Sequence, residues 1–263
     1  MRKTIIFLSV MITFLTLLLG GLRCHPYYQY ATVNDFLFHC KMKLNDTLRI
    51  AFIGDSWAAY HRGYDSLLQV MLVSDSLPVA VKSQGNVGAK SKEIYERLAT
   101  TTKSILEWQP DYCIISAGIN DAVAKLGETF YVFHYGLIIS QLLEMGIKPI
   151  ILEIPDVNYK SIVEREPIQM YLHHMVSAFL MNSDLHDFKS YRRALYKKVF
   201  MTDWKNRVIY IKAAQWNPQG FLDNRNLYLT DDTHLNTKGY HVLDSCIASE
   251  IRNDRFANQI TFQ

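Results

Sequence analysis

The sequence predicts an α/β domain in which helices cover both faces of a five-stranded parallel sheet. Three observations support this. Short apolar runs recur along the chain, separated by stretches with helical patterning. Several runs are almost continuously apolar, as in strands buried on both faces. Regular alternation of strands and helices is typical of parallel sheets with right-handed crossovers. The expected strands are residues 48–53, 79–82, 112–117, 149–154 and 208–211.

Helices are expected between these strands. Gly146 is a stop signal for the third helix, because glycine readily adopts the left-handed conformation that ends many helices. The connection at about residues 156–206 is much longer than a crossover requires, and we expect it to form a helical insertion. The expected helices around the sheet are residues 65–73, 91–108, 129–145 and 237–251, and those of the insertion are residues 162–180 and 185–200.

Positive charge gathers in the second half of this insertion. One interpretation is an ordinary solvated helix face. The other is a basic rim that attracts an acidic glycan or an anionic membrane surface to the sheet edge where the fourth strand ends. The residues concerned are Lys189, Arg192, Arg193, Lys197, Lys198 and Lys205.

The first 23 residues predict a membrane-directed segment. Arg2 and Lys3 precede an uncharged stretch, residues 4–22, which Arg23 closes. At ~1.5 Å per residue this stretch nearly spans a hydrocarbon layer of ~30 Å. We expect an uncleaved signal anchor in residues 1–23, with a cytoplasmic N-terminus and an exported domain. A cleaved or lipidated signal peptide, giving a secreted or lipid-attached protein, is the alternative. Residues 24–47 are expected to form a spacer before the globular domain of residues 48–263.

Composition excludes several function classes. The chain has 263 residues and a net charge of +3, which is too small to favour nucleic acid as a partner. No Cys-x-x-Cys pair occurs, so neither a metal site nor a redox site is expected. Cys113 and Cys246 lie in apolar patterns and are expected to be buried thiols. A disulfide between Cys24 and Cys40 is one possibility that their spacing does not decide.

Polar blocks stand where strands end. Ser56 directly follows the first strand, Asn120 follows the third, and Asp231 precedes His234 by three residues near the C-terminus. Open parallel sheets carry their sites at the carboxyl ends of the strands. A serine becomes a good nucleophile only when a base takes its proton. These residue types therefore predict a serine hydrolase, although Ala58 breaks the Gly-x-Ser-x-Gly pattern of the α/β-hydrolase elbow.

Four ordered blocks identify the resemblance. They are Gly-Asp-Ser at 54–56, a glycine-containing block at 85–91, Gly-Ile-Asn-Asp at 118–121 and Asp-Asp-Thr-His at 231–234. This set resembles the SGNH (GDSL-like) hydrolase superfamily over about residues 48–255. The resemblance implies a flavodoxin-like three-layer α/β/α fold. It also implies ester hydrolysis or a related acyl transfer, with no metal and no organic cofactor.

The resemblance also implies a role for each matching residue. Ser56 is the expected nucleophile, His234 the general base and Asp231 the carboxylate that holds the imidazole. The expected oxyanion hole combines the backbone N–H groups of Ser56 and Gly88 with the side chain of Asn120.

Neighbouring residues compete for two of these roles. Asp232 competes with the preceding aspartate for the carboxylate role, and Gly85 competes for the glycine role. Asp55 and Asp121 are interpreted as supports of their turns. Trp57 replaces the leucine that is commonest in the family's first block, and we expect it to pack beneath the nucleophile turn.

The sequence as a whole predicts a membrane-tethered, exported serine esterase. The preferred substrate is an O-acyl ester, such as O-acetyl, on a glycan; this follows from the family and the export signal. One alternative is an O-acyltransferase that passes the acyl group to a sugar hydroxyl. Another is a non-catalytic glycan-binding module with a relic site. The sequence does not specify an oligomeric state, an acyl chain length or the alcohol.

Overall fold

The sheet has the predicted five parallel strands. The computed structural model describes residues 2–40, 47–73, 78–183 and 188–260, without the side chains of residues 2–7, 163 and 258–260. The strand order β2-β1-β3-β4-β5 is that of flavodoxin-like sheets. The strands are β1 (Leu48–Gly54), β2 (Val79–Gly85), β3 (Tyr112–Ser116), β4 (Lys148–Leu152) and β5 (Ile209–Ile211).

The strand register brings three loops to one edge of the sheet. Gly54, the last residue of β1, pairs with Gly85 at the end of β2 and with Ser116 at the end of β3. The segments that follow these strands therefore leave the sheet side by side. They carry three of the four polar blocks singled out in the sequence.

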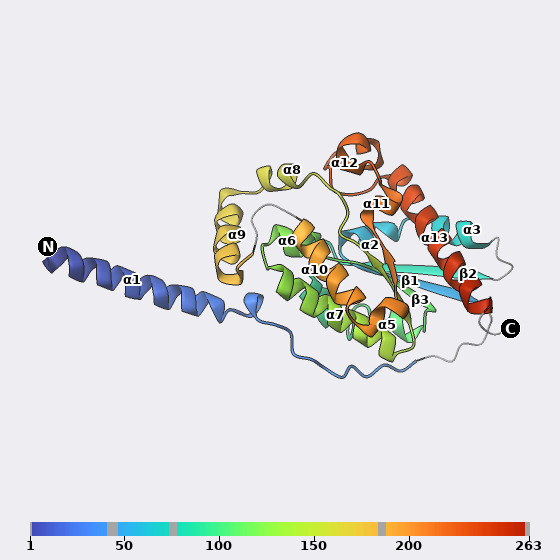
Figure 1. The fold of residues 1–263 in the computed structure, drawn as a ribbon, viewed down its shortest axis with the longest axis horizontal. Helices are drawn as coiled ribbons and strands as arrows, with labels where there is room; N and C mark the ends of the chain where they lie inside the picture. Colours follow the sequence, from blue (N-terminus) through green and yellow to red (C-terminus); the bar gives the residue numbers. More distant parts are fainter. Residues whose placement is uncertain (1, 41–46, 74–77, 184–187, 261–263) are drawn as a thin grey trace.

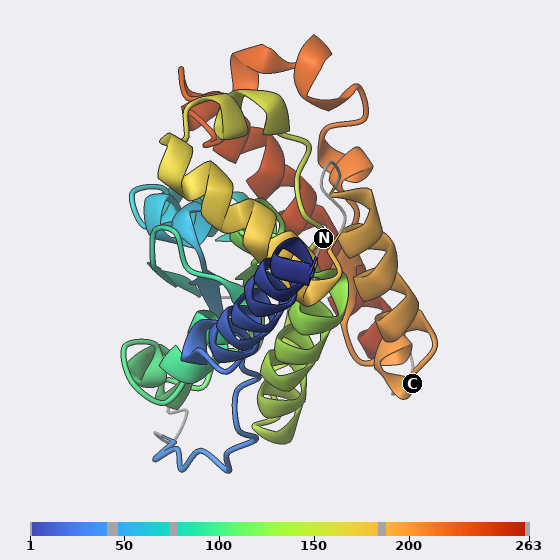
Figure 2. The same ribbon diagram turned by 90° about the vertical axis from the view of Figure 1, so that its left-hand side faces the viewer.

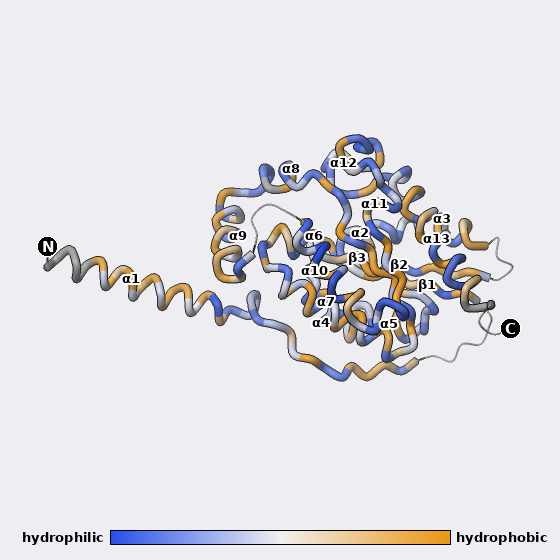
Figure 3. Tube along the Cα trace, viewed as in Figure 1, coloured by the Kyte–Doolittle hydropathy of each residue, from blue (hydrophilic) through white to orange (hydrophobic). Residues whose placement is uncertain are grey.

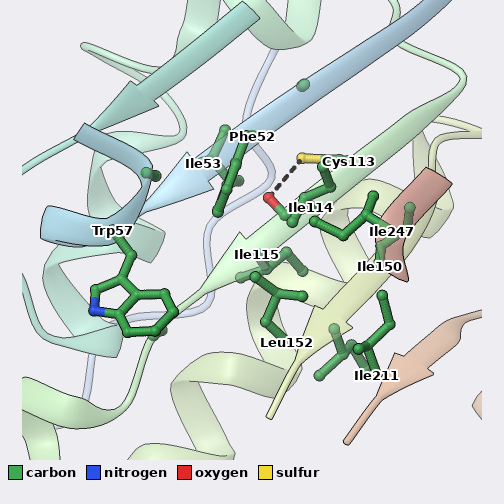
Figure 4. Packing of buried hydrophobic residues seen from close by; sticks show 14 of the residues in the cluster. Phe52, Ile53, Trp57, Cys113, Ile114, Ile115, Ile150, Leu152, Ile211 and Ile247 are labelled. Atoms are coloured by element: carbon green, nitrogen blue, oxygen red, sulfur yellow. Dashed lines mark hydrogen bonds between the residues drawn. The ribbon is translucent and has the colours of Figure 1, made fainter. Parts of the chain in front are cut away.

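Helices cover both faces of the sheet. One face packs against helices that follow β1 and against the C-terminal helix. The other packs against helices that follow β2 and β3 and against one helix of the insertion. The first group is α2 (Ser56–His61), α3 (Asp65–Leu72) and α13 (Thr237–Ile260); the second is α4 (Ser91–Arg97), α7 (Glu128–Glu144) and α10 (Lys189–Phe200). Between them the strands are buried on both faces: the partners Phe52 and Ile114 point to one face, the next pair, Ile53 and Ile115, points to the other, and all four are fully buried (Figure 4).

Two expected helices are each divided into two. Residues 91–108 form α4 and α5 (Lys103–Glu107), because the three threonines at 100–102 favour helix poorly and a turn replaces it there. Residues 162–180 form α8 (Tyr159–Glu164) and α9 (Ile168–Met181). Pro167 stands at the start of α9, and a proline disfavours helix in the residue before it.

The insertion's last helix and several short elements complete the fold. The expected helix at 185–200 begins at Lys189 in α10, and residues 184–187 lie outside the described part of the chain. The sequence did not predict the short helices, which are η1 (Pro26–Tyr28), α6 (Ile119–Val123), η3 (Asp203–Asn206), α11 (Ala213–Trp216), α12 (Gly220–Asp223) and η4 (Arg225–Leu227).

The N-terminal helix α1 (Arg2–Arg23) projects from the domain (Figures 1 and 2). Its large apolar side chains from Leu8 to Leu18 are exposed, and the coloured part of the helix is mostly hydrophobic (Figure 3). Taken over the described residues, no helix has both the length and the apolar character needed to cross a membrane. Cys24 and Cys40 are both free, so the disulfide considered from the sequence is not formed.

The segment after α1 lies along the domain. The Tyr28 hydroxyl is 2.9 Å from the Ser177 hydroxyl of α9. The Ala31 N–H donates to Nε2 of His134, whose Nδ1 lies 2.8 Å from the Phe130 carbonyl of its own helix. The first part of the expected spacer is therefore packed against α7 and α9.

Candidate active site

A tight turn at the end of β1 presents Ser56. Gly54 has a φ of +147°, and a Cβ there would lie 2.0 Å from the Ser116 carbonyl oxygen, so only glycine fits. Asp55 follows as the N-cap of α2 and accepts the Trp57 N–H at 3.0 Å. Ser56 is the first residue of α2, and this cap fixes its position at the sheet edge.

A second turn presents His234. The Asp231 Oδ1 atom accepts the backbone N–H groups of Thr233 and His234, both at 2.9 Å. The Leu229 N–H donates to the His234 carbonyl at 2.7 Å and closes the loop. An aspartate that accepts hydrogen bonds from backbone N–H groups two and three residues later is typical of such turns. Local chemistry therefore holds Asp231 beside the imidazole.

These two turns bring three predicted residues into one chain of hydrogen bonds. Oδ2 of Asp231 lies 2.6 Å from Nδ1 of His234, and Nε2 of His234 lies 2.8 Å from the Ser56 Oγ. The Ser56 residue is 7% exposed, and the His234 side chain is 16% exposed. A carboxylate at Nδ1 holds the ring proton there, which leaves Nε2 as an acceptor facing the serine hydroxyl.

The Asp231 carboxylate is kept ionised by its surroundings. Partial burial acts to raise its pKa. The hydrogen bonds from the His234 backbone and ring and from the Thr233 N–H outweigh burial, so the pKa of Asp231 lies below its usual range. A negative charge therefore persists beside His234 at neutral pH.

Asp232 does not share this arrangement. Its backbone has a φ of +57°, and its side chain points toward Arg225. The Arg225 Nε donates to Asp232 Oδ1 at 2.9 Å. Its Oδ2 accepts from Asn158 at 3.3 Å and lies 3.8 Å from the Arg165 guanidinium. Of the two competing aspartates, only Asp231 reaches the histidine ring.

Three N–H donors lie on the segments that follow β1, β2 and β3, whose ends are adjacent in the sheet. Across the described residues, the backbone N–H groups of Ser56 and Gly88 have no acceptor. Asn120 donates one Nδ2 hydrogen to the Ala89 carbonyl at 3.0 Å, which orients the amide and leaves the second hydrogen available. These are the three donors that the resemblance predicted for an oxyanion hole.

The two candidate glycines have different surroundings. Gly88 has a φ of +77°, and a Cβ there would meet no atom within 4 Å. A Cβ on Gly85 would lie 2.1 Å from the Ala59 backbone nitrogen, so this glycine allows β2 and α2 to pack closely. Gly88 is therefore the glycine on the open side of the loop.

Two buried carboxyl groups support the turns, as the sequence suggested. Burial raises the pKa of Asp55 to about 7, against the hydrogen bonds from Trp57 and Ser116 that act to lower it. Burial likewise raises the pKa of Asp121 to about 6, although this carboxyl accepts both the backbone N–H and the hydroxyl of Ser91. Asp121 thereby links the loop after β3 to the start of α4.

Trp57 packs beneath the nucleophile turn, as expected. It is 2% exposed and contacts Trp216 edge-on, with the ring centroids 5.8 Å apart. Its backbone carbonyl accepts the Tyr240 hydroxyl of α13 at 2.9 Å. The indole therefore fills space between the turn and the helices on this face of the sheet.

Two contacts with the histidine turn were not predicted. The Tyr60 ring packs edge-on against His234 at 4.6 Å between centroids. Its position one helical turn after Ser56 is the signal that could have revealed it. Arg165, which joins α8 to α9, donates to the Asp231 carbonyl at 2.9 Å. No local pattern in the sequence indicates this second contact, because it joins segments far apart in the chain.

The expected basic rim is partly engaged in structure. The Arg192 Nε donates to the Ile154 carbonyl at 2.7 Å, and its guanidinium lies 3.4 Å from Asp156. This arginine therefore fixes α10 to the segment after β4. Among the described residues, no group of three or more histidine, cysteine, aspartate and glutamate side chains is arranged to hold a metal ion.

Comparison with known proteins adds a family match. Residues 52–242 match the GDSL-like Lipase/Acylhydrolase family, which is more than half of the chain. No curated protein sequence matches the chain.

Three similar solved structures share the fold at low sequence identity. The acetyl xylan esterase AlAXEase is 17% identical, with a TM-score of 0.54 over 78% of this chain and 98% of that chain. A mutant of Axe2, an acetyl-xylooligosaccharide esterase from Geobacillus Stearmophilus, is 16% identical, with a TM-score of 0.56 over 80% and 96%. A GDSL-like lipase from Bacteroides thetaiotaomicron is 16% identical, with a TM-score of 0.50 over 79% and 89%.

Proposed function

Because the chain belongs to the GDSL-like lipase/acylhydrolase family and is a hydrolase, we propose that it is a serine esterase acting through Ser56, His234 and Asp231. The observation that supports this most directly is the chain of hydrogen bonds from Asp231 Oδ2 through the imidazole to the Ser56 hydroxyl, at 2.6 and 2.8 Å. A nucleophile, a base and a group that orients the base are the parts required for acyl transfer.

The first half of the reaction forms an acyl-enzyme. Nε2 of His234 takes the Ser56 proton as Oγ attacks the ester carbonyl carbon. The imidazolium that forms is stabilised by the Asp231 carboxylate. The carbonyl oxygen gains negative charge in the tetrahedral intermediate. Collapse of this intermediate breaks the bond to the alkoxy oxygen, which receives the proton from His234 and leaves as the alcohol.

The second half returns the free enzyme. Water replaces the alcohol and gives its proton to His234 as its oxygen attacks the acyl carbon. Collapse of the second intermediate breaks the bond to Oγ, and His234 reprotonates Ser56 as the carboxylic acid leaves. In both halves the developing oxyanion accepts from the backbone N–H groups of Ser56 and Gly88 and from the Asn120 amide. A single such donor can stabilise the transition state by about 3–4 kcal/mol.

We propose O-acetyl groups on a glycan as the substrate class. Two of the similar structures are described as an acetyl xylan esterase and an acetyl-xylooligosaccharide esterase. The test is a panel on the purified full-length chain, comparing nitrophenyl acetate to decanoate with acetylated xylan and acetylated chitin oligomers. Preference for acetate esters and release of acetate from a glycan support this class. A preference for decanoate with no release from either glycan would contradict it.

We also propose that α1 attaches the enzyme to a membrane, with the domain exported. One support is the uncharged stretch at residues 4–22. The other is the exposure of its large apolar side chains from Leu8 to Leu18; the side chains of residues 4–7 lie outside the described part of the chain. Partition of the full-length chain with membranes, and an intact N-terminus by mass spectrometry, are the expected results. A mature N-terminus at Cys24 or beyond would show cleavage instead.

The nucleophile is tested with a fluorophosphonate probe, which reacts with activated serines. The wild type and the Ser245→Ala control should be labelled, because Ser245 lies on the exposed surface of α13. Ser56→Ala and His234→Ala should not be labelled, and each should lose ester turnover by several orders of magnitude. Labelling of Ser56→Ala, or retention of more than a tenth of its activity, would refute the assignment.

A further inference from the structure

Helix α9 has its apolar side on the outside. The large side chains that it exposes include Ile168 at 67%, Leu172 at 57% and Phe179 at 72%. The side that faces the domain carries His174, Ser177 and Ala178. His174 Nδ1 lies 2.9 Å from Glu166 Oε2, and the Ser177 hydroxyl lies 2.9 Å from that of Tyr28. A surface helix normally has the reverse distribution.

The exposed residues form one stripe along the helix. Ile168, Leu172, Met175 and Phe179 follow each other at three- and four-residue spacing, and Tyr171 lies beside them. The helix contains no aspartate, glutamate, lysine or arginine. A contiguous exposed apolar surface marks a site of interaction with a protein or a membrane. We call these five residues the α9 apolar face.

The end of α1 lies beside this helix. Tyr27 and Tyr28 follow Arg23 by only four and five residues. The Tyr27 ring is 5.4 Å from the His173 ring of α9, and Tyr28 is bonded to Ser177. The chain therefore leaves the apolar helix α1 and reaches α9 within one short turn.

The two helices run in different directions. α9 borders the side of the domain from which α1 projects, and its axis runs across the direction of α1 (Figures 1 and 2). A bilayer entered by α1 along the helix axis would lie flat against that side of the domain. A helix that lies in the plane of such a surface buries its apolar side in the boundary between headgroups and acyl chains.

We infer that the α9 apolar face docks onto the lipid surface of the membrane that α1 enters. The inference rests on the proposed attachment through α1. A lipid surface fits this face better than water does, because no charged side chain of α9 has to be removed from solvent. Docking holds the insertion against the membrane, and the insertion holds the active site: Arg165, three residues before α9, donates to the Asp231 carbonyl.

The test measures the depth of a fluorescent label in the full-length chain. A nitrobenzoxadiazole label is placed at Leu172→Cys, and in a control protein at Val70→Cys, after both exposed native cysteines are replaced by serine. Val70 is 71% exposed on α3, at the other end of the domain (Figure 1). Each protein is reconstituted into phosphatidylcholine vesicles whose acyl chains carry bromine, which quenches only labels that enter the lipid.

The label at residue 172 should be quenched at least threefold more than the label at residue 70. Adding Phe179→Glu to the Leu172→Cys protein should reduce that difference by half or more, while the protein still floats with the vesicles. Unchanged thermal unfolding in detergent shows that this variant is folded.

Three results would overturn the inference, and they differ in what else they refute. Flotation with vesicles but equal quenching at residues 172 and 70 refutes docking and leaves the attachment through α1 intact. Failure to float refutes both. Energy transfer between labels at residue 172 on different molecules, without quenching by lipid, would make the face a contact between two copies and would also refute docking.

Discussion

The exchange of Asp231 for asparagine tests the proposed mechanism most sharply, because the structure dictates how the new amide must sit. Two backbone N–H groups, those of Thr233 and His234, point at Oδ1 from 2.9 Å. Asparagine must therefore place its oxygen there, since two donors cannot face an NH₂ group. The NH₂ group then faces Nδ1 of His234, where Oδ2 now lies at 2.6 Å.

That orientation reverses the proton arrangement of the imidazole. Nδ1 has to accept from the new amide, so the ring proton moves to Nε2 and points at the Ser56 hydroxyl. The ring then cannot take the serine proton. We therefore expect Asp231→Asn to lower kcat by about 10⁴, the loss that the wrong tautomer causes in a Ser-His-Asp triad, which corresponds to about 5.5 kcal/mol.

Asp232→Asn is the matched control, because it makes the same exchange one residue away. Asp232 contacts Arg225 and Arg165, which are at least half exposed, and it does not reach the imidazole. We expect its kcat to fall less than tenfold and its free energy of unfolding to fall by roughly 1–2 kcal/mol.

The assay compares nitrophenyl acetate turnover of both variants with their thermal unfolding. The reasoning would be refuted by Asp231→Asn keeping more than a tenth of the wild-type kcat. Equal losses of kcat in the two variants would refute it as well.

Three further predictions concern residues around the site. Asn120→Ala should lower kcat by roughly 10²–10³ with KM little changed, because its donor acts on the oxyanion; an effect confined to KM would show substrate positioning instead. Arg165→Met should lower kcat about three- to tenfold through loss of its bond to the Asp231 carbonyl, and Arg165→Lys should recover part of this; a change in KM alone would contradict a positioning role. The third prediction concerns His61, which is fully buried: burial acts to lower its pKa, but Asp244 and a second aspartate raise it to about 9. A folded pKa above the ordinary 6.5 stabilises the protein fully below pH 6.5, and this contribution, on the order of 3 kcal/mol, is lost as pH rises through 9. In urea unfolding, the free energy of unfolding of His61→Gln should not show this fall between pH 6.5 and 9. The same pH dependence in the variant and the wild type would argue against a charged His61.

The sequence by itself determined the strands of the sheet and the candidate residues of the site. Strands buried on both faces need continuous apolar runs, and those runs are visible without any knowledge of their partners. The hydrogen bonds that shape the turns at Ser56 and His234 are equally local, because Asp55 caps one turn at Trp57 and Asp231 shapes the other within four residues. Local chemistry of this kind can be predicted from neighbouring residues alone.

Only the tertiary structure decided between neighbours of the same type. Sequence spacing does not distinguish Asp231 from Asp232 as the carboxylate, and it hardly distinguishes Gly85 from Gly88 as the glycine of the site. The choice depends on where each side chain or missing Cβ points relative to segments far away in the chain, such as Arg225 beside Asp232 and α2 beside Gly85. Arg192 reads as a solvated cation in sequence, yet it is bonded to the Ile154 carbonyl.

The same limit explains α9. Its residues read as an ordinary apolar helix, and the helical pattern alone predicts that the apolar stripe faces the core. Which stripe turns inward is set by what the neighbouring segments offer. Here Tyr28 and Glu166 supply partners for Ser177 and His174, so the polar side turns to the domain and the apolar side is left outside. Hydrophobic periodicity indicates that a helix has two faces, but only the surrounding contacts decide which of them is buried.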